Sequence, residues 1–75
     1  MATLSHRERL LRRRLASNVR RLRKLHGLSL EKAAGSADLH PRHWQKLEAA
    51  EVGISLRTLI RVSLALKVEP SDLLA

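Results

Sequence analysis

The side chains that could do chemistry in this sequence are mainly arginines, and they are concentrated near the N-terminus. Residues 1–26 contain nine Lys and Arg residues against a single acid, Glu8, whereas residues 27–75 contain six bases and six acids. The formal net charge of +8 therefore belongs entirely to the first third of the chain. This asymmetry favours an arm or face that binds a polyanion, although a solvated helix face that keeps a protein soluble has the same composition.

Other chemistries have weaker support. His40 and His43 have a helical spacing that could chelate zinc, but no third ligand is evident and the chain has no cysteine. Ser, His and Asp occur without a nucleophile motif, and 75 residues leave little room for a buried catalytic cleft. We therefore expect neither an enzyme nor a metal site, and neither a cofactor nor a small-molecule substrate.

Length and hydropathy predict a small single-domain protein. Of the 75 residues, 44% are hydrophobic and 29% are charged, which is enough for one folded domain. No run approaches the ~18–20 apolar residues of a membrane span, and the first residues lack the apolar region of a secretory signal. Leu4, Leu10 and Leu11 alternate with arginines, a pattern that would also suit a helix on another chain or an anionic membrane. Without an aromatic anchor in this segment we expect no membrane partner and a cytoplasmic protein.

Hydrophobic periodicity predicts an all-α fold with five helical segments. Leu11, Leu15, Val19 and Leu22 are spaced by four, four and three residues, which places them on one helix face. The first predicted helix lies within residues 5–26, with Thr3 or Ser5 as its cap and Gly27 at its end. The second helix follows the cap Ser29, and the third runs from Pro41 to about Ala49. The fourth helix follows the cap Ser55, and a last turn begins at Pro70. We divide the chain into a basic N-terminal arm or helix extension, residues 1–14, and a domain, residues 15–75.

Two stretches carry a resemblance to a known family. The stretch GLSLEKAAGSADLHPRHWQKLE, residues 27–48, and the stretch SLRTLIRVSLALKVEPSDLL, residues 55–74, resemble the Cro and lambda-repressor type of helix-turn-helix domain, the Xre family. The resemblance implies a compact five-helix lambda-repressor-like domain, here with an extended basic first helix. It also implies a sequence-specific transcriptional regulator that binds double-stranded DNA, bacterial or phage-encoded and associated with the nucleoid.

The resemblance further implies roles for individual residues. The recognition helix, residues 41–49, would enter the major groove. Its base-reading positions fall on Pro41, Arg42, Gln45 and Lys46, and Arg42 could bond both O6 and N7 of one guanine. Phosphate contacts are expected from His40, His43 and Arg57 and, in the basic segment, from Arg12, Arg13 and Arg14. Arg23 and Glu48 match a structural ion pair that joins the first helix to the end of the recognition helix.

Two family positions bear on the core and the turn. Trp44, the only aromatic residue, falls on an inward aliphatic position, so we expect it in the core. The neighbouring Ala33, Ala34 and Ala37 are small, which would leave room for the indole. Asp38 replaces the glycine of the turn, and Asp tolerates the positive φ that this position needs.

Several departures from the family pattern weaken the expected grip on phosphate. Leu30 replaces a Gln that commonly contacts a phosphate, and Ala49, Ala50 and Glu51 replace a loop that is usually basic. An alternative is therefore a protein-interaction module, antitoxin-like or a regulatory partner, on a helix-turn-helix scaffold with little base readout.

We also expect a homodimer, because a single module of this size gains little base readout. Two copies would place their recognition helices about one helical turn apart on a pseudo-palindrome. The predicted interface is Leu66, Val68, Leu73 and Leu74, for which burial in the core is the alternative.

Overall fold

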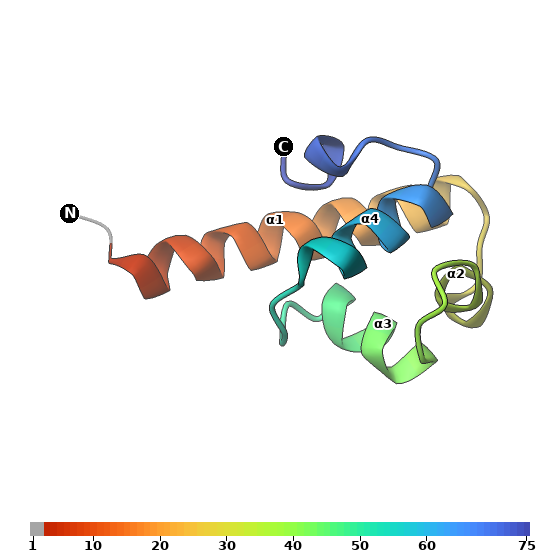
Figure 1. Ribbon diagram of the computed structural model, residues 1–75, viewed down its shortest axis with the longest axis horizontal. Helices are drawn as coiled ribbons and strands as arrows, with labels where there is room; N and C mark the ends of the chain where they lie inside the picture. The colour runs from red at the N-terminus through yellow and green to blue at the C-terminus, as the bar shows by residue number, and fades with distance from the viewer. Residues whose placement is uncertain (1–2) are drawn as a thin grey trace.

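The polypeptide folds into helices only, as the periodicity of the sequence predicts. The computed structural model describes residues 3–75, and these contain no strand. In chain order the elements are α1, Leu4–Leu25; α2, Leu30–Ser36; α3, Pro41–Glu48; α4, Leu56–Ala65; and a 3-10 turn, η1, Pro70–Leu73 (Figure 1). The all-α prediction with five helical segments is confirmed, and the last of them is a single 3-10 turn.

The helices begin at polar residues that satisfy backbone donors of the first turn. Thr3 Oγ1 accepts a hydrogen bond from the backbone N–H of His6 at the start of α1, so that Thr3 and not Ser5 is the cap. At the start of α2 the hydroxyl of Ser29 accepts a hydrogen bond from the backbone N–H of Lys32. At the start of α4 the hydroxyl of Ser55 accepts one from the backbone N–H of Thr58. These donors have no partner inside the helix, and each cap therefore stabilises its helix by about 1 kcal/mol.

Residues with a positive φ end the helices. Gly27 follows α1 with a φ of 66°, and Asp38 follows α2 with a φ of 55°, which confirms the prediction for the turn. Ala50 after α3 and Lys67 after α4 have φ values of 60° and 57°. This conformation costs an L-residue about 1–2 kcal/mol. The packing of α3 and of α4 must therefore offset that cost at the C-terminal end of each helix.

Trp44 of α3 lies at the centre of the core. Its side chain is 0% exposed, as are Ala33 and Ala34 of α2, and all three belong to one hydrophobic cluster. The prediction that Trp44 is a core residue is confirmed, and the small side chains of α2 leave space for the indole. The other buried members of the cluster are Leu15, Val19, Leu22, Ala37, Leu47, Leu59, Val62, Leu66 and Leu73.

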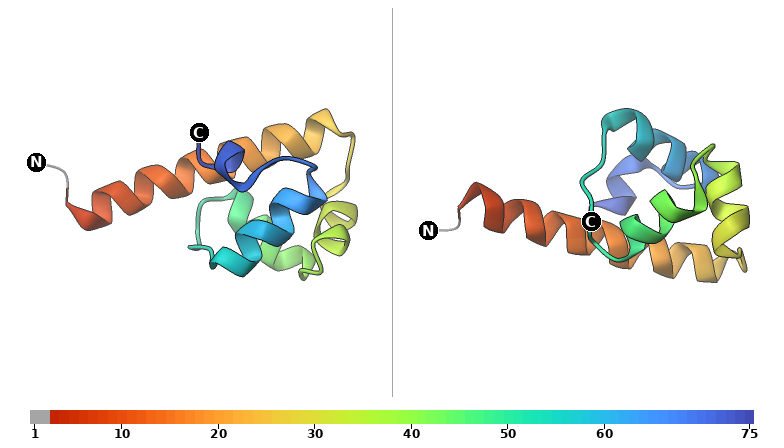
Figure 2. Two further views of the ribbon diagram at one scale, coloured as in Figure 1. Left: turned by 45° about the horizontal axis from the view of Figure 1, so that its top comes forward. Right: turned by 90° about the horizontal axis from the view of Figure 1, so that it is seen from below.

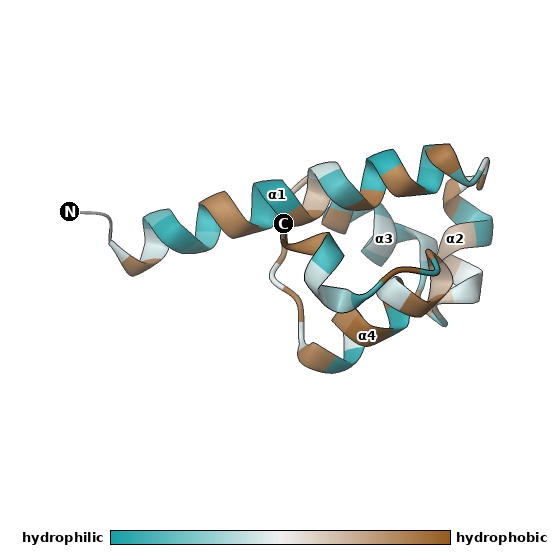
Figure 3. Cartoon of the chain, turned by 90° about the horizontal axis from the view of Figure 1, so that it is seen from above, coloured by the Kyte–Doolittle hydropathy of each residue, from teal (hydrophilic) through white to brown (hydrophobic). Residues whose placement is uncertain are grey.

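The N-terminal half of α1 projects beyond this core. It gives the molecule principal extents of 40 × 22 × 20 Å, and Figures 1 and 2 show it leaving the body of the domain. Of the predicted apolar stripe, Leu15 is 3% exposed but Leu11 is 46% exposed, because the body of the domain ends near this turn. Figure 3 shows hydrophobic and hydrophilic residues alternating along the projection. Residues 4–14 continue α1 without a break, and residues 1 and 2 of the predicted arm lie outside the described residues.

The predicted dimer interface is wrong for two of its four residues. Leu66 and Leu73 are both 0% exposed and belong to the core cluster, because η1 folds back onto α1 and α4. Val68 and Leu74 are partly buried against the same cluster.

The exposed apolar side chains of α4 lie elsewhere on the helix. Leu56, Ile60 and Leu64, which we call the outer stripe of α4, are 78%, 50% and 72% exposed. They are spaced by four residues, so they share one face.

None of the described helices is long and apolar enough to cross a bilayer.

Candidate nucleic-acid interface

The first turn of α3 is built to expose its polar side chains. His40 is the cap, and its Nδ1 accepts a hydrogen bond from the backbone N–H of Arg42 at 3.1 Å. Pro41 occupies the first turn, where its missing N–H costs nothing. Because Trp44 and Leu47 anchor the opposite face in the core, Arg42 and Gln45 are left exposed.

The remaining predicted residues of α3 lie beside this exposed face. His43 and Lys46 are partly buried, as is Pro41. Arg57 is exposed in the first turn of α4. α3 thus presents Arg42 and Gln45 on an outer face that we call the reading face, with Lys46 and His43 at its borders.

A bidentate ion pair fixes the C-terminal end of α3 to α1. Arg23 Nε lies 2.6 Å from Glu48 Oε2, and its Nη2 donates to Glu48 Oε1 at 3.0 Å. The remaining guanidinium nitrogen, Nη1, donates to the carbonyl of Leu28 at 3.0 Å. Trp44 Nε1 also donates to Glu48 Oε2. The predicted pair therefore exists in the structure, and it holds the indole and α3 in one orientation.

Burial makes the loss of one partner of this pair more costly than at a surface salt bridge. The side chains of Arg23 and Glu48 are 14% and 10% exposed. The hydrogen bond to Glu48 raises the pKa of Arg23, against an opposing effect of burial. A raised pKa means that the contribution of Arg23 to stability is fully present below its ordinary pKa and is lost only as the pH rises through the folded value.

The turn between α2 and α3 brings the two helices together as a unit. Asp38 reverses the chain with its positive φ, and the N–H of Leu39 donates to the carbonyl of Ala34 at 2.9 Å. Ala34 and Ala37 are buried at this crossing, where a larger side chain would separate the helices. The two helices and their turn form the motif that the sequence predicts.

The three arginines of the basic segment that are predicted to contact phosphate have different surroundings. Arg12 lies 3.1 Å from Glu8, and its guanidinium occupies the space beside Gly53 in the α3–α4 loop. Its Nε is buried without a hydrogen-bond partner among the described residues. Arg14 lines a small hollow with Arg7, Leu10 and Leu11 on the projecting part of α1. Of the three, only Arg13 lines the hollow that also contains Ala49 and Ala50 at the end of α3.

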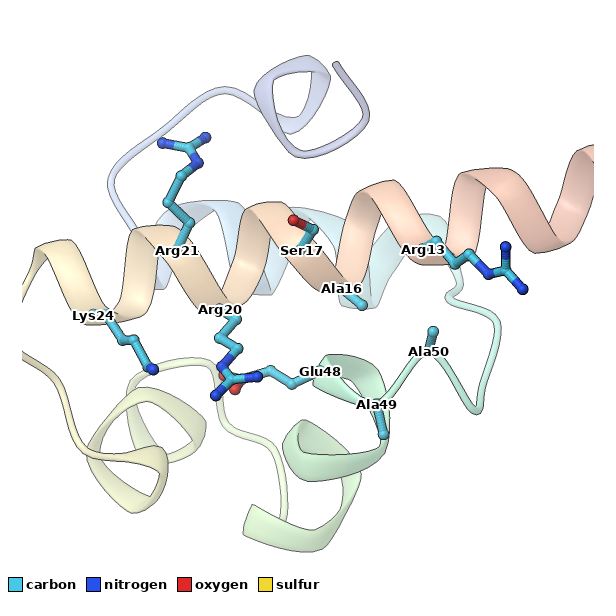
Figure 4. Close-up of a pocket in the computed structure, with 9 residues that line it drawn as sticks. All are labelled: Arg13, Ala16, Ser17, Arg20, Arg21, Lys24, Glu48, Ala49 and Ala50. Atoms are coloured by element: carbon cyan, nitrogen blue, oxygen red, sulfur yellow. The ribbon is translucent and has the colours of Figure 1, made fainter.

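A basic groove separates α1 from the C-terminal end of α3. It has a volume of about 440 Å³ and an open mouth, and we call it the α1–α3 groove. Figure 4 shows Arg20 and Lys24 extending from α1 toward the α3 side, whereas Arg21 extends to the other side of α1. The lining residues are Arg13, Ala16, Ser17, Arg20, Arg21, Lys24, Glu48, Ala49 and Ala50.

The sequence did not single out Arg20 and Lys24, and a signal for them exists. Arg13, Ser17, Arg20 and Lys24 are spaced by four, three and four residues, so they share a helix face opposite to the apolar stripe. Arg20 and Lys24 lie beside Ala49 and Ala50 because α1 packs against α3. The spacing of residues along α1 does not predict that packing.

The structure gives no metal centre at the histidine pair. Within residues 3–75, no three His, Cys, Asp or Glu side chains gather closely enough to hold a metal ion. His40 is instead a helix cap.

Comparison with known proteins identifies this arrangement. A family model described as Helix-turn-helix, HTH_3, matches residues 19–73. Among solved structures, the restriction-modification controller protein C.AhdI from Aeromonas hydrophila is 27% identical, with a TM-score of 0.80, over 83% of this chain and 94% of that chain. The clp gene regulator ClgR from C. glutamicum is 28% identical, with a TM-score of 0.79, over 85% of this chain and 83% of that chain.

A third structure shows the same fold at lower identity. It is an HTH_3 family transcriptional regulator from Vibrio cholerae, 23% identical with a TM-score of 0.83, and the match covers 88% of this chain but 37% of that one. Among curated protein sequences, none matches this chain significantly.

Proposed function

Because this chain belongs to the helix-turn-helix family HTH_3 and is a DNA-binding transcriptional regulator, we propose that it recognises a specific duplex sequence with α3 in the major groove. The observation that carries this proposal is the reading face, which is exposed while the rest of α3 is anchored by Trp44, Leu47 and the Arg23–Glu48 pair. A recognition helix must be held rigidly, because base readout depends on the position of a few side chains.

Arg42 is the residue expected to contribute most to base discrimination. Its side chain is exposed in the first turn of α3, the part of a recognition helix that meets the base edges. A bidentate contact with guanine O6 and N7 contributes about 1–3 kcal/mol of discrimination. Lys46 and Gln45 lie one turn further on and can reach a neighbouring base, and Pro41 can contact a thymine methyl group.

Selection of a duplex consensus followed by binding measurements tests this function. Arg42→Ala is expected to weaken binding to the selected duplex about 5- to 150-fold and to relax preference at one base pair. Arg57→Ala, at a position expected to contact phosphate, should weaken all duplexes alike. If the wild-type protein selects no sequence and does not bind duplex DNA even at low salt, the proposal is wrong and the protein-interaction module is favoured.

Polar and basic side chains beside the reading face supply the contacts with phosphate in this proposal. His40, His43 and Arg57 lie on or near α3 and the start of α4, and α1 adds the arginines of its basic segment, Arg12, Arg13 and Arg14. Contacts of this kind give affinity that falls as salt rises, without base preference.

The regulator acts as a homodimer in this proposal, with the outer stripe of α4 at the interface. Leu56, Ile60 and Leu64 are exposed and evenly spaced. When α4 packs antiparallel to its copy, Ile60 meets Ile60 on the two-fold axis and each Leu56 meets Leu64 of the other copy. The stripe is therefore complementary to itself, as a two-fold interface requires.

Charge also favours a second copy at α4 over other parts of the surface. Residues 51–75 contain three bases and three acids, so this part of the molecule carries no net charge to repel its copy. The basic half of α1 would repel its copy strongly. In the view from above, α1 and α4 lie on opposite sides with α3 between them, so a contact through α4 leaves α1 free (Figure 3).

Ile60→Lys tests the dimer. It places two ammonium groups beside the two-fold axis and should shift the molecular mass in sedimentation equilibrium from dimer to monomer. Leu25→Lys, at a leucine that is 73% exposed on α1, is the control and should leave the mass unchanged. A wild-type protein that remains monomeric when bound to a palindromic duplex would exclude the dimer.

We further propose that the protein acts in the cytoplasm of a bacterium, close to the nucleoid, because a DNA-binding regulator works where the DNA is. The proposed role uses no catalytic group, metal or cofactor, and the partners that it requires are duplex DNA and a second copy of this chain.

A further inference from the structure

The α1–α3 groove lies outside the residues so far assigned to base readout. We propose that it binds the phosphate backbone of the duplex, and that Arg13, Arg20 and Lys24 hold successive phosphates there. This inference rests on the proposed function, since it specifies how the DNA bound by α3 is held at one strand. It adds Arg20 and Lys24 to the phosphate contacts of the proposed function.

Uncompensated positive charge is the first observation in its favour. Arg13, Arg20 and Lys24 are exposed, and no residue among 3–75 forms a hydrogen bond or an ion pair with their side chains. The only acid that lines the groove is Glu48, and Arg23 and Trp44 already occupy its carboxylate oxygens. The groove therefore attracts an anion, because its one acidic side chain, Glu48, is already paired and does not neutralise these cations.

The arrangement of these cations is unfavourable for α1 alone. Arg20 and Lys24 are four residues apart on the same face, a spacing at which like charges repel one another. In the same helix, Arg12 has Glu8 as its partner at this spacing. A bound polyanion would supply for Arg20 and Lys24 the negative charge that the sequence supplies for Arg12.

The groove is continuous with the reading face of α3. Arg42, Gln45 and Ala49 are exposed and spaced by three and four residues, so they form one line along α3, and Ala49 lines the groove. The eight residues of α3 span about 12 Å, which is roughly the width of the major groove. When the first turn of α3 meets the bases, its C-terminal end therefore reaches the edge of the major groove, where one strand runs.

The same contact explains how phosphate is held without a basic α3–α4 loop. Ala49 and Ala50 offer only methyl groups to the groove, and Glu51 follows them. Across the groove, α1 provides the cations that this loop lacks (Figure 4). Phosphate binding is thus transferred from the loop to the neighbouring helix.

The length of the charged line indicates a polymer and not a single phosphate. Arg13 and Lys24 are eleven residues apart on α1, or about 16 Å along the helix axis. One phosphate group cannot contact both ends of such a line. The continuity with a major-groove helix favours duplex DNA over RNA, whose major groove is too narrow to admit a helix.

A pair of matched double variants tests the proposal. Arg13→Ala/Arg20→Ala removes two charges that line the groove, and Arg7→Ala/Arg9→Ala removes two exposed charges from the same helix, which lie outside it. Both variants have the same net charge. Binding of the selected duplex is measured by fluorescence anisotropy over a series of salt concentrations, with circular dichroism to confirm that both variants fold.

The groove variant is expected to reduce the slope of log K against log salt by about 1.8, or 0.9 for each lost contact, and to weaken binding roughly 10- to 100-fold at low salt. The Arg7/Arg9 variant should keep the slope of the wild type. Base preference should be unchanged in both.

Three outcomes would overturn the proposal. Equal losses in the two variants would show an effect of net charge only, and an unchanged slope in the groove variant would show that the groove is merely solvated. Equally tight, groove-dependent binding of duplex RNA would show that the occupant is wrong. In each case a wild-type protein that still selects its duplex through Arg42 leaves the proposed function intact, whereas absence of wild-type binding overturns both.

Discussion

The two halves of α1 have similar compositions and very different surroundings. Residues 4–14 contain five arginines and three leucines, and residues 15–25 contain four cations with leucines and valine at helical spacing. In the second half Leu15, Val19 and Leu22 are buried and Arg23 is tied to Glu48. In the first half Leu4, Leu10 and Leu11 are exposed. The comparison teaches that the role of a leucine or an arginine on this helix is set by the elements packed against it.

Arg23 and Arg12 give the largest expected difference between the halves. Arg23→Ala should destabilise the fold by about 3–5 kcal/mol, because it leaves the Glu48 carboxylate buried without its charged partner. Arg12→Ala removes a partly exposed i, i+4 pair together with a buried Nε that has no partner in the described residues, so it should cost at most about 1 kcal/mol. Urea unfolding followed by circular dichroism measures both. Similar losses for the two variants would contradict the comparison.

Leu15 and Leu11 test the same difference with apolar side chains. Leu15→Ala should cost about 2–5 kcal/mol, because it opens a cavity beside Val19 in the core. Leu11→Ala removes a side chain that is 46% exposed, and we expect a loss below about 1 kcal/mol. The midpoints of thermal unfolding should separate the two variants clearly. A large loss from Leu11→Ala would mean that the N-terminal half is packed against a second molecule in solution.

The caps give the smallest difference. Ser55→Ala removes the acceptor of the Thr58 N–H at the start of α4, inside the domain, and should cost about 1 kcal/mol. Thr3→Ala removes the cap of a helix end that projects into solvent, so only the first turn should fray, with little change in global stability. Amide hydrogen exchange should show lost protection near His6 for Thr3→Ala and a global decrease for Ser55→Ala.

Much of the fold follows from local features of the sequence. The caps Ser29 and Ser55, the proline at the start of α3 and the positive φ of Asp38 are properties of a few neighbouring residues, and all are present in the structure. The Arg23–Glu48 pair was found through the family resemblance, because no local pattern connects residues so far apart.

The features that the sequence missed depend on packing between elements. On α4 and its C-terminal cap Leu66, two sets of apolar residues have helical spacing. Only the packing of η1 and α2 against α4 decides that Leu66 is buried and Ile60 exposed. The same holds for the groove, since Arg20 and Ala50 are neighbours only when α1 and α3 are in contact. Helical periodicity identifies faces, and it does not identify what covers them.

The position of Trp44 has a practical consequence for work on this protein. It is the only aromatic residue of the chain, it is fully buried, and its indole N–H is bound to the carboxylate that ties α3 to α1. Intrinsic fluorescence and near-ultraviolet circular dichroism therefore both report on one side chain, on the face of α3 that packs against the core. A red shift of its fluorescence emission would show that α3 has separated from the core, without any attached label.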